Sequence, residues 1–399
     1  MLKQFTEIDH WLLEHQAFWR IEPFLQACFP EQRLPSIPAH IQEWLNTLQP
    51  EEILRYKLSP EQLYAKLRRL LPSIASNILN VSEPQFSSPK LELSAHSCTG
   101  IPGRKLEQIV AMSSVCLDSN RDIQWLEWCS GKGYLGRLLA SVSGQNVTSL
   151  EFQQQLCRDG QHYAEQHHLP MTFVHGDAFS DEAESLCCSD KHAVALHACG
   201  DLHVRLIKNA AQSGMAALSV APCCYHLIQD ESYQPLSSAA KQSGMRLSKA
   251  DLRIPLQETV TGGERVHRHR KLEMTYRLAF QHLITTELGI DDYLPIPSIK
   301  KSLLSKGFEA FCHWAADKKQ LTLPSVDWAE YEREGEQRFW RMEALSLLPQ
   351  LFRRPLEQWL VLDRALFLIE HGYSVEVGTF CQREVTPRNL LIRANRASN

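Results

Sequence analysis

Hydrophobic residues recur at three- and four-residue spacing through the first 80 positions, as in Trp11, Leu12 and Phe18 or in Leu63 and Leu67. This spacing predicts amphipathic helices. Residues 81–103 are then rich in serine, proline and polar side chains, which is typical of a linker. We therefore expect a helical N-terminal domain with its linker over residues 1–95 and a second domain over residues 96–399.

Short apolar runs alternate with helical patterns after the linker, which predicts parallel β/α units. The expected strands cover residues 123–128, 146–152, 171–174, 193–197 and 216–220, and a long apolar helix near 356–372 leads to two further strands at 373–380 and 390–393. The last two strands read as a closing antiparallel hairpin. The stretch from about 230 to 350 is helical and charged, so we expect an insertion after the fifth strand of an α/β sheet.

The sequence EWCSGKGYLG, residues 127–136, places Gly131 and Gly133 between the first strand and the next helix. A glycine-rich corner lets backbone approach a ligand and directs helix N–H groups at it. Cys129 stands where a dinucleotide motif has its first glycine. Glu127 would attract an ammonium group but repel a pyrophosphate, which favours S-adenosylmethionine as the ligand.

Two more carboxylates follow at successive strand ends. Glu151 ends the second strand, a position from which a carboxylate reaches ribose hydroxyls. Asp177 ends the third strand and can accept from an adenine amino group. Either residue alone would be a solvated carboxylate in most proteins, so the interpretation depends on their conjunction with the glycine corner.

The motifs HACGD and PCCYH follow the fourth and fifth strands, where reacting groups of an open α/β sheet gather. We expect them to form a methyl-acceptor pocket, although a buried core histidine or thiol is the alternative for any one of them. The catalytic candidates are His197, Cys199, Asp201, Cys223, Cys224, Tyr225 and His226.

Several kinds of chemistry stay open for these candidates. His226 or Asp201 could remove a proton from a hydroxyl or amide, whereas a thiolate could add to a pyrimidine ring. Zinc binding by the thiols is the third possibility. The sequence has no C-x-x-C pair, and adjacent cysteines rarely both ligate one zinc, so we expect no metal site.

Composition indicates the class of protein and the cellular compartment. The 399 residues exceed an average domain, and 44% hydrophobic with 22% charged residues is ordinary for a soluble protein without a membrane span. Glu7, Asp9 and Glu14 interrupt the apolar N-terminus, which argues against a secretory signal. We expect a cytoplasmic protein whose twelve cysteines are reduced thiols.

A net charge of −4 means that a nucleic acid would need a local basic patch. The best candidate is the stretch 262–277, although a solvated helix face is its ordinary explanation. The connection between the last two strands adds a further candidate pair, for which a plain hairpin turn is an equal alternative. The substrate-side candidates are Arg265, Arg268, Arg270, Lys271, Arg388 and Asn389.

Five segments together, GRKLEQI, EWCSGKGYLG, ALHACGDLH, APCCYHLI and VTPRNLLI, resemble one set of class I methyltransferases. This is the methyltransferase-like 25 family with the methyltransferase half of the glutathione S-transferase C-terminal domain-containing protein. More distant tRNA ribose methyltransferases of the acceptor stem share a similar His-x-Cys-Gly and Cys-Cys-x-His pair. The resemblance covers roughly residues 100–230 and 355–395.

The resemblance implies a Rossmann-like seven-stranded methyltransferase sheet with S-adenosylmethionine as methyl donor. Lys105 matches a basic position of the family, and an ordinary surface lysine is its alternative. The cofactor-side candidates are Lys105, Glu127, Cys129, Gly131, Gly133, Glu151, Asp177 and His197. We expect base-assisted methyl transfer to tRNA or rRNA, with a protein-directed methyltransferase or a non-catalytic binding module as the alternatives.

Overall fold

The computed structural model describes residues 1–32, 34, 37–75, 78, 83–87, 89–93, 95–119, 123–257 and 263–397. The chain divides into two compact units. We call residues 1–14, 76–258 and 354–399 the sheet unit, and residues 15–75 and 259–353 the helical unit.

The two units differ from the expected domains, which divided at residue 95. The first helix, α1 (Leu2–Glu14), belongs to the sheet unit because its apolar face packs on a helix near the other end of the chain. The rings of Phe5 and Trp359 lie 5.3 Å apart, and Trp359 Nε1 donates to Asp9 Oδ1 over 2.8 Å. Part of the expected linker lies outside the described residues, and Phe86 N, in the part that is described, bonds to the carbonyl of Thr379.

Seven strands form one sheet in the sheet unit. They are β1 (Gln124–Trp128), β2 (Val147–Glu151), β3 (Met171–His175), β4 (Lys191–Ala195), β5 (Ala217–Val220), β6 (Tyr373–Thr379) and β7 (Leu390–Arg396). The other helices of this unit are α7 (Ala95–Cys98), α8 (Gly103–Ser119), α9 (Tyr134–Ser143), α10 (Gln154–Gln166), α11 (Asp181–Ser185), α12 (Asp201–Ser213), α13 (Ser238–Gln242) and the 3-10 helix η3 (Asp251–Leu256). The long helix α18 (Leu347–Glu370) enters this unit at residue 354.

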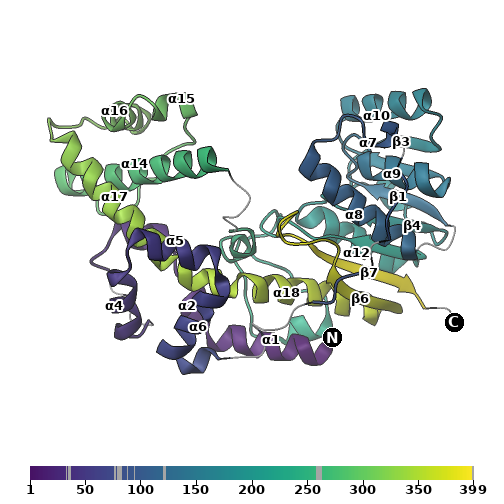
Figure 1. Ribbon diagram of the computed structural model, residues 1–399, viewed down its shortest axis with the longest axis horizontal. Coiled ribbons are helices and arrows are strands. Elements are labelled where there is room, and N and C mark those ends of the chain that lie inside the picture. The colour runs from purple at the N-terminus through teal and green to yellow at the C-terminus, as the bar shows by residue number, and fades with distance from the viewer. Residues whose placement is uncertain are drawn as a thin grey trace. The chain divides into compact units, whose positions relative to one another are not determined.

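The strand order is β3-β2-β1-β4-β5-β7-β6. Strands β1 to β5 pair in parallel, and β7 runs antiparallel between β5 and β6. The Rossmann-like sheet with its closing antiparallel hairpin is therefore confirmed (Figure 1). The order reverses between β1 and β4, the kind of position at which open α/β sheets bind ligands.

Helices cover both faces of this sheet, which explains why its strands are apolar on both sides. Trp125 and Val147 face a core shared with α8 and α9, whereas Leu126 and Leu218 face a core shared with α12 and the later part of α18. The alternation along β1 sends Glu127 to the same face as Trp125. Its carboxylate thus points toward α9.

The helical unit contains α2 (Gln16–Trp19), α3 (Pro23–Cys28), α4 (Ala39–Thr47), α5 (Pro50–Leu58), α6 (Pro60–Leu70), η1 (Pro72–Ile74), α14 (Glu264–Leu288), α15 (Lys301–Leu304), α16 (Phe308–Lys319) and α17 (Trp328–Leu345). Aromatic rings such as Phe280 and Phe311 fill the core between α14 and α16. The expected helical insertion is therefore present, and it packs with helices from the N-terminal part of the chain, such as α3 against α17. Among the described helices of the whole chain, none is long and apolar enough to cross a membrane.

A buried ion pair links α5 to α17 within the helical unit. The side chains of Lys57 and Glu343 are 6% and 5% exposed and bond to each other, and Arg270 Nη2 also donates to Glu343 over 2.7 Å. A charge left alone at such a position is costly, because burial removes the water that would solvate it.

Replacing Glu343 with leucine should destabilise the protein by about 3–5 kcal/mol, because Lys57 would keep a buried charge without its partner. The double variant Lys57→Met/Glu343→Leu should recover most of this loss. Guanidinium unfolding measures both. Equal destabilisation of the single and double variants would contradict the importance of the pair.

Candidate functional site

A small cavity opens where the strand order reverses between β1 and β4. It is lined by residues from α8, from the end of β1, from the start of α9 and from the segment after β4. These residues are Lys105, Ile109, Glu127, Trp128, Cys129, Ser130, Tyr134, Leu135, Leu196 and His197. Four of the expected cofactor-side residues therefore line one cavity, together with apolar and aromatic side chains that the sequence did not single out.

Glu127 lies at the base of this cavity and is 3% exposed. Ser149 Oγ donates to Glu127 Oε2 over 2.8 Å from the neighbouring strand β2. Burial raises the pKa of Glu127 to about 7, although hydrogen bonds from the backbone of Gly136, from Ser149 and from the backbone of Leu135 and the charge of Arg137 all oppose this shift. A carboxyl group with such a pKa changes its charge readily when a cation arrives.

Gly136 makes room for the Glu127 carboxylate. A Cβ at Gly136 would lie 2.5 Å from Glu127 Oε2 and 2.9 Å from Val147 Cγ1. Gly136 is the last residue of the segment EWCSGKGYLG. Its partner lies across the fold, so spacing along the chain could not reveal the contact.

The glycine corner itself is bound to the end of β2. Gly131 N donates to Glu151 Oε2 over 2.9 Å, and Gln153 N donates to Glu151 Oε1 over 2.8 Å. Cys129, Gly131 and Gly133 all have left-handed backbone, with φ of 56°, 60° and 68°. Such a conformation is costly for cysteine, so the tight turn is maintained despite a side chain that disfavours it.

Asp177 lies in the exposed loop after β3, near the same corner. Its Oδ1 accepts a hydrogen bond from Phe179 N over 2.9 Å. Burial raises the pKa of the Cys129 thiol to about 12, and the negative charges of Glu151 and Asp177 act in the same direction. The carboxylates of Glu151 and Asp177 therefore both lie close enough to raise the pKa of Cys129, so the ends of β2 and β3 lie near the glycine corner.

Positive side chains lie on the β4 side of the cavity. Lys105 Nζ lies 5.0 Å from the centre of the Tyr134 ring. The ring of His197 opens to solvent, but protein surrounds much of it. This desolvation, with the charges of Lys105 and Arg388, lowers the pKa of His197. Arg388 therefore reaches this edge from the connection between β6 and β7.

Three thiols meet beyond the ends of β4 and β5. The backbones of Cys199 and Cys223 pair in an isolated parallel β-bridge. Their Sγ atoms lie 3.5 Å apart. The Sγ atoms of Cys199, Cys223 and Cys224 all lie within 4.8 Å of one another. Gly200 permits this approach, because a Cβ there would lie 1.9 Å from the carbonyl oxygen of Leu227.

Three other candidates have side chains engaged in structural contacts. Asp201 begins α12, and its Oδ2 accepts from Gln229 N over 2.8 Å. Tyr225 is 1% exposed and packs against Arg364, with the guanidinium carbon 5.3 Å from the ring centre. Asn389 Nδ2 donates to the carbonyl of Cys381 over 2.8 Å. These contacts position the loops around the site.

The basic stretch 262–277 belongs to the helical unit. Some of its basic side chains form ion pairs and others do not. Gly262 lies outside the described residues, and α14 begins at Glu264. Arg270 bonds to Glu343, and Lys271 Nζ bonds to Glu336 over 2.5 Å. Arg265 and Arg268 are exposed, and within the described part of the chain neither forms an ion pair.

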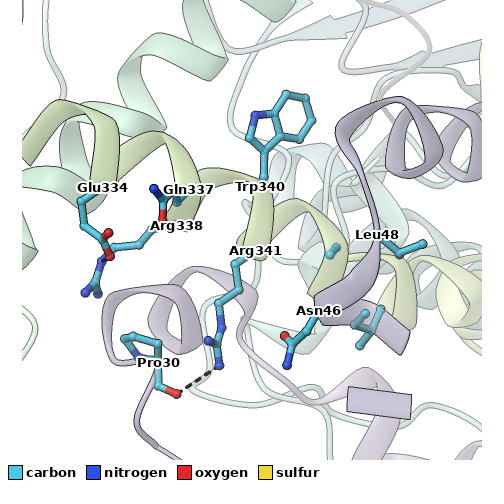
Figure 2. A pocket seen from close by; sticks show the side chains of 10 residues that line it. Pro30, Asn46, Leu48, Glu334, Gln337, Arg338, Trp340 and Arg341 are labelled. Atoms are coloured by element: carbon cyan, nitrogen blue, oxygen red, sulfur yellow. Dashed lines mark hydrogen bonds and ion pairs between the residues drawn. The ribbon is translucent and has the colours of Figure 1, made fainter. Parts of the chain in front are cut away.

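A pocket of about 410 Å³ in the helical unit was not anticipated from the sequence. It lies between α17 and the segments around residues 30 and 45–48. Figure 2 shows the guanidinium group of Arg341 between Pro30 and Asn46, and Arg341 Nη2 donates to the Pro30 carbonyl over 3.0 Å. Arg341 Nε is buried and has no hydrogen-bond partner among the described residues. The indole of Trp340 also lines the pocket.

One segment of the sheet unit matches a known protein family. Residues 104–231, about a third of the chain, match the model of a family described as a methyltransferase domain. The matched segment begins in α8 and ends after β5, so it contains the cavity residues and the three thiols. No curated protein matches the sequence.

Several solved structures match parts of the chain. The Pyrococcus abyssi tRNA (uracil-54, C5)-methyltransferase with S-adenosyl-L-homocysteine is 18% identical over 29% of this chain and 28% of that chain, with a TM-score of 0.24. The 23S rRNA methyltransferase ErmE is 16% identical over 60% and 97% of the two chains, with a TM-score of 0.24. Coclaurine N-methyltransferase bound to N-methylheliamine and S-adenosylhomocysteine is 12% identical over 82% and 93%, with a TM-score of 0.26. Scores this low say nothing about the substrate of this chain.

Gly136→Ala should destabilise the sheet unit by about 1–3 kcal/mol, because the added methyl group would overlap the Glu127 carboxylate and Val147. Gly103→Ala is the matched control, since a Cβ at Gly103 would meet nothing within 4 Å. Chemical unfolding compares the two variants. The account of the corner would be wrong if Gly136→Ala were as stable as Gly103→Ala.

Proposed function

We propose that the chain is an S-adenosylmethionine-dependent methyltransferase of the methyltransferase-like 25 type that acts on tRNA or rRNA. The observation that carries this proposal is the placement of Glu127 and Glu151 on either side of a glycine corner at the point where the strand order reverses. The motifs HACGD and PCCYH support the narrower family assignment.

The residues at the corner suit the parts of this cofactor. Glu127 would bind its ammonium group, Glu151 its ribose hydroxyls and Asp177 its adenine amino group. The cavity measures about 30 Å³, so it would enclose only the portion against Glu127, and the remainder would lie along the strand ends. When bound, the cofactor supplies a sulfonium methyl group that a nucleophile can attack.

The acceptor would lie over the ends of β4 and β5. His197 would take the acceptor's proton, a role supported by its position on the cavity lining and by its ring opening to solvent. Lys105 and Arg388 lie near His197 and would attract a phosphate group. This arrangement supports base-assisted methyl transfer.

Basic groups in the helical unit support RNA as the substrate. Arg265 and Arg268 project into solvent, and Arg341 offers a buried N–H without a partner among the described residues. Trp340 also lines the pocket, and its ring, which Figure 2 shows directed away from Arg341, is an aromatic surface on which a base can stack. A phosphate or a base edge could satisfy the N–H of Arg341 only after the side chain moves, because Nε is buried.

Glu127→Gln should weaken S-adenosylmethionine binding at least tenfold, because the neutral amide loses the charge that attracts the ammonium group. Glu165→Gln is the matched control on the exposed face of α10. Calorimetry with the purified chain measures both affinities. Unchanged binding by Glu127→Gln would contradict the assignment of the ammonium site.

The same carboxylate predicts a pH dependence. With a pKa of about 7, Glu127 loses its charge as the pH falls from 8 to 6, so the affinity ratio of the native protein to Glu127→Gln should fall about tenfold. Taking the ratio removes the titration of the ligand itself. A ratio that does not vary with pH would exclude Glu127 as the titrating group.

The stability of Glu127→Gln shows whether a loss of binding results from unfolding. Burial raises the pKa of Glu127 from its ordinary value of 4.5 to about 7, so ionisation of Glu127 lowers the stability as the pH rises from about 4.5 to about 7, and the loss is constant above that. Glu127→Gln should therefore be at least as stable as the native protein at pH 8. Weak binding by this variant would then not result from unfolding.

RNA binding should depend on Arg265 and Arg268. The double variant Arg265→Ala/Arg268→Ala should weaken binding of total tRNA and make the dependence on salt less steep, by about one log unit per log unit of salt for each phosphate that the variant no longer binds. Lys301→Ala/Lys306→Ala removes the same charge elsewhere in the helical unit and is the control. Equal salt dependence of all three proteins would exclude the two arginines as phosphate ligands.

Mass spectrometry of RNA nucleosides tests the reaction itself. Cells that lack the gene should lose one methylated nucleoside, and the purified chain with S-adenosylmethionine should restore it on their RNA. If every methylated nucleoside persisted and labelled methyl groups passed to protein, the protein-directed alternative would replace this proposal. Cofactor binding without transfer to either would favour a non-catalytic binding module.

A further inference from the structure

The loops after β4 and β5 bring together more sulfur than the sequence spacing predicted. Cys223 and Cys224 are adjacent, and neighbouring residues of an extended chain point in opposite directions. Cys224, however, has left-handed backbone with φ of 47°, which turns the chain at this residue. The two adjacent sulfurs can therefore both approach Cys199, which comes from the other strand end.

The distances suit a tetrahedral metal ion. Zinc–sulfur bonds of about 2.3 Å place the sulfurs of a tetrahedron about 3.8 Å apart. Here the Sγ atoms of Cys199 and Cys223 are 3.5 Å apart, and all three sulfurs lie within 4.8 Å of one another. These distances bracket the value of about 3.8 Å that a tetrahedral zinc site requires.

His226 is the candidate for a fourth ligand, and because its ring nitrogens lie outside the group of Sγ atoms within 4.8 Å of one another, its side chain would have to rotate to reach the metal. His226 follows Cys224 by two residues and lies close enough for its charge to act on that thiol. His226 Nδ1 is buried and has no hydrogen-bond partner within the described part of the chain. A buried nitrogen without a partner is costly, and coordination would satisfy it.

We propose that Cys199, Cys223, Cys224 and His226 bind one zinc ion, which joins the loops after β4 and β5. The three thiols release their protons to solvent on binding, and the neutral His226 contributes a lone pair. Zinc with three thiolates carries one net negative charge, which Arg388 beside Cys224 offsets. None of these four ligands lines the proposed cofactor cavity, so the proposal does not depend on methyl transfer.

Metal content of the full chain, purified under reducing conditions without chelator, is the first test. We expect one zinc per chain. After removal of zinc, cobalt(II) should bind one to one and give the strong visible absorption of a tetrahedral thiolate site. Zinc well below one per chain together with no cobalt–thiolate absorption would overturn the proposal.

Substitutions identify the ligands. Cys199→Ser, Cys223→Ser and Cys224→Ser should each weaken cobalt binding at least tenfold, and His226→Ala should weaken it and shift the absorption. Cys188→Ser is the matched control, because Cys187 and Cys188 form the other adjacent pair and lie outside the cluster. Binding that survives all three cysteine substitutions would contradict the site.

Three measurements separate a loss of metal binding from unfolding and from oxidation. Far-ultraviolet circular dichroism of the metal-free variants shows whether they fold, and excess zinc should raise the melting temperature of the native chain but not of Cys199→Ser. Mass spectrometry of unfolded protein with blocked thiols detects a Cys199–Cys223 disulfide. A metal-free chain carrying that disulfide after purification under these conditions would replace the metal site with a redox pair.

Discussion

The buried carboxylate of Glu127 is the interaction on which the architecture of the site depends. It accepts hydrogen bonds from Ser149 on β2 and from the backbone of α9, so one side chain joins two strands to the helix that follows the corner. Position 136 requires glycine because a Cβ there would overlap that carboxylate. The same burial that raises its pKa keeps water away from the place where a cation would bind.

The carboxyl edge of the sheet divides into two chemical halves. Carboxylates lie at the ends of β1 and β2, where Glu151 also fixes the glycine corner through Gly131. Thiols and basic groups lie beyond β4 and β5, where Arg388 affects both His197 and Cys224. A methyl donor with an ammonium group and an acceptor with phosphate groups would be drawn to opposite halves, which would align them across the point where the strand order reverses.

The sequence predicted local features well, because they depend on neighbouring residues. The strands, their order along the chain and the glycine corner follow from periodicity and from residues such as Gly131, whose left-handed backbone a turn requires. What it missed depends on residues that are distant in sequence. The packing of Phe5 on Trp359 placed α1 with the sheet, and the pairing of Arg270 with Glu343 removed one cation from the expected basic patch. Zinc binding by the thiols was one possibility from the sequence, but adjacency of Cys223 and Cys224 argued against it, because spacing along the chain carries no information about sulfurs that meet across two strand ends.

A crystal structure of the chain with S-adenosylhomocysteine tests the central claim most directly. The ligand's ammonium group should lie within hydrogen-bond distance of Glu127, with its ribose hydroxyls on Glu151. A nucleoside bound elsewhere on the protein, or a Glu127 carboxylate still enclosed by Ser149 and Gly136 with no ligand group beside it, would contradict the account.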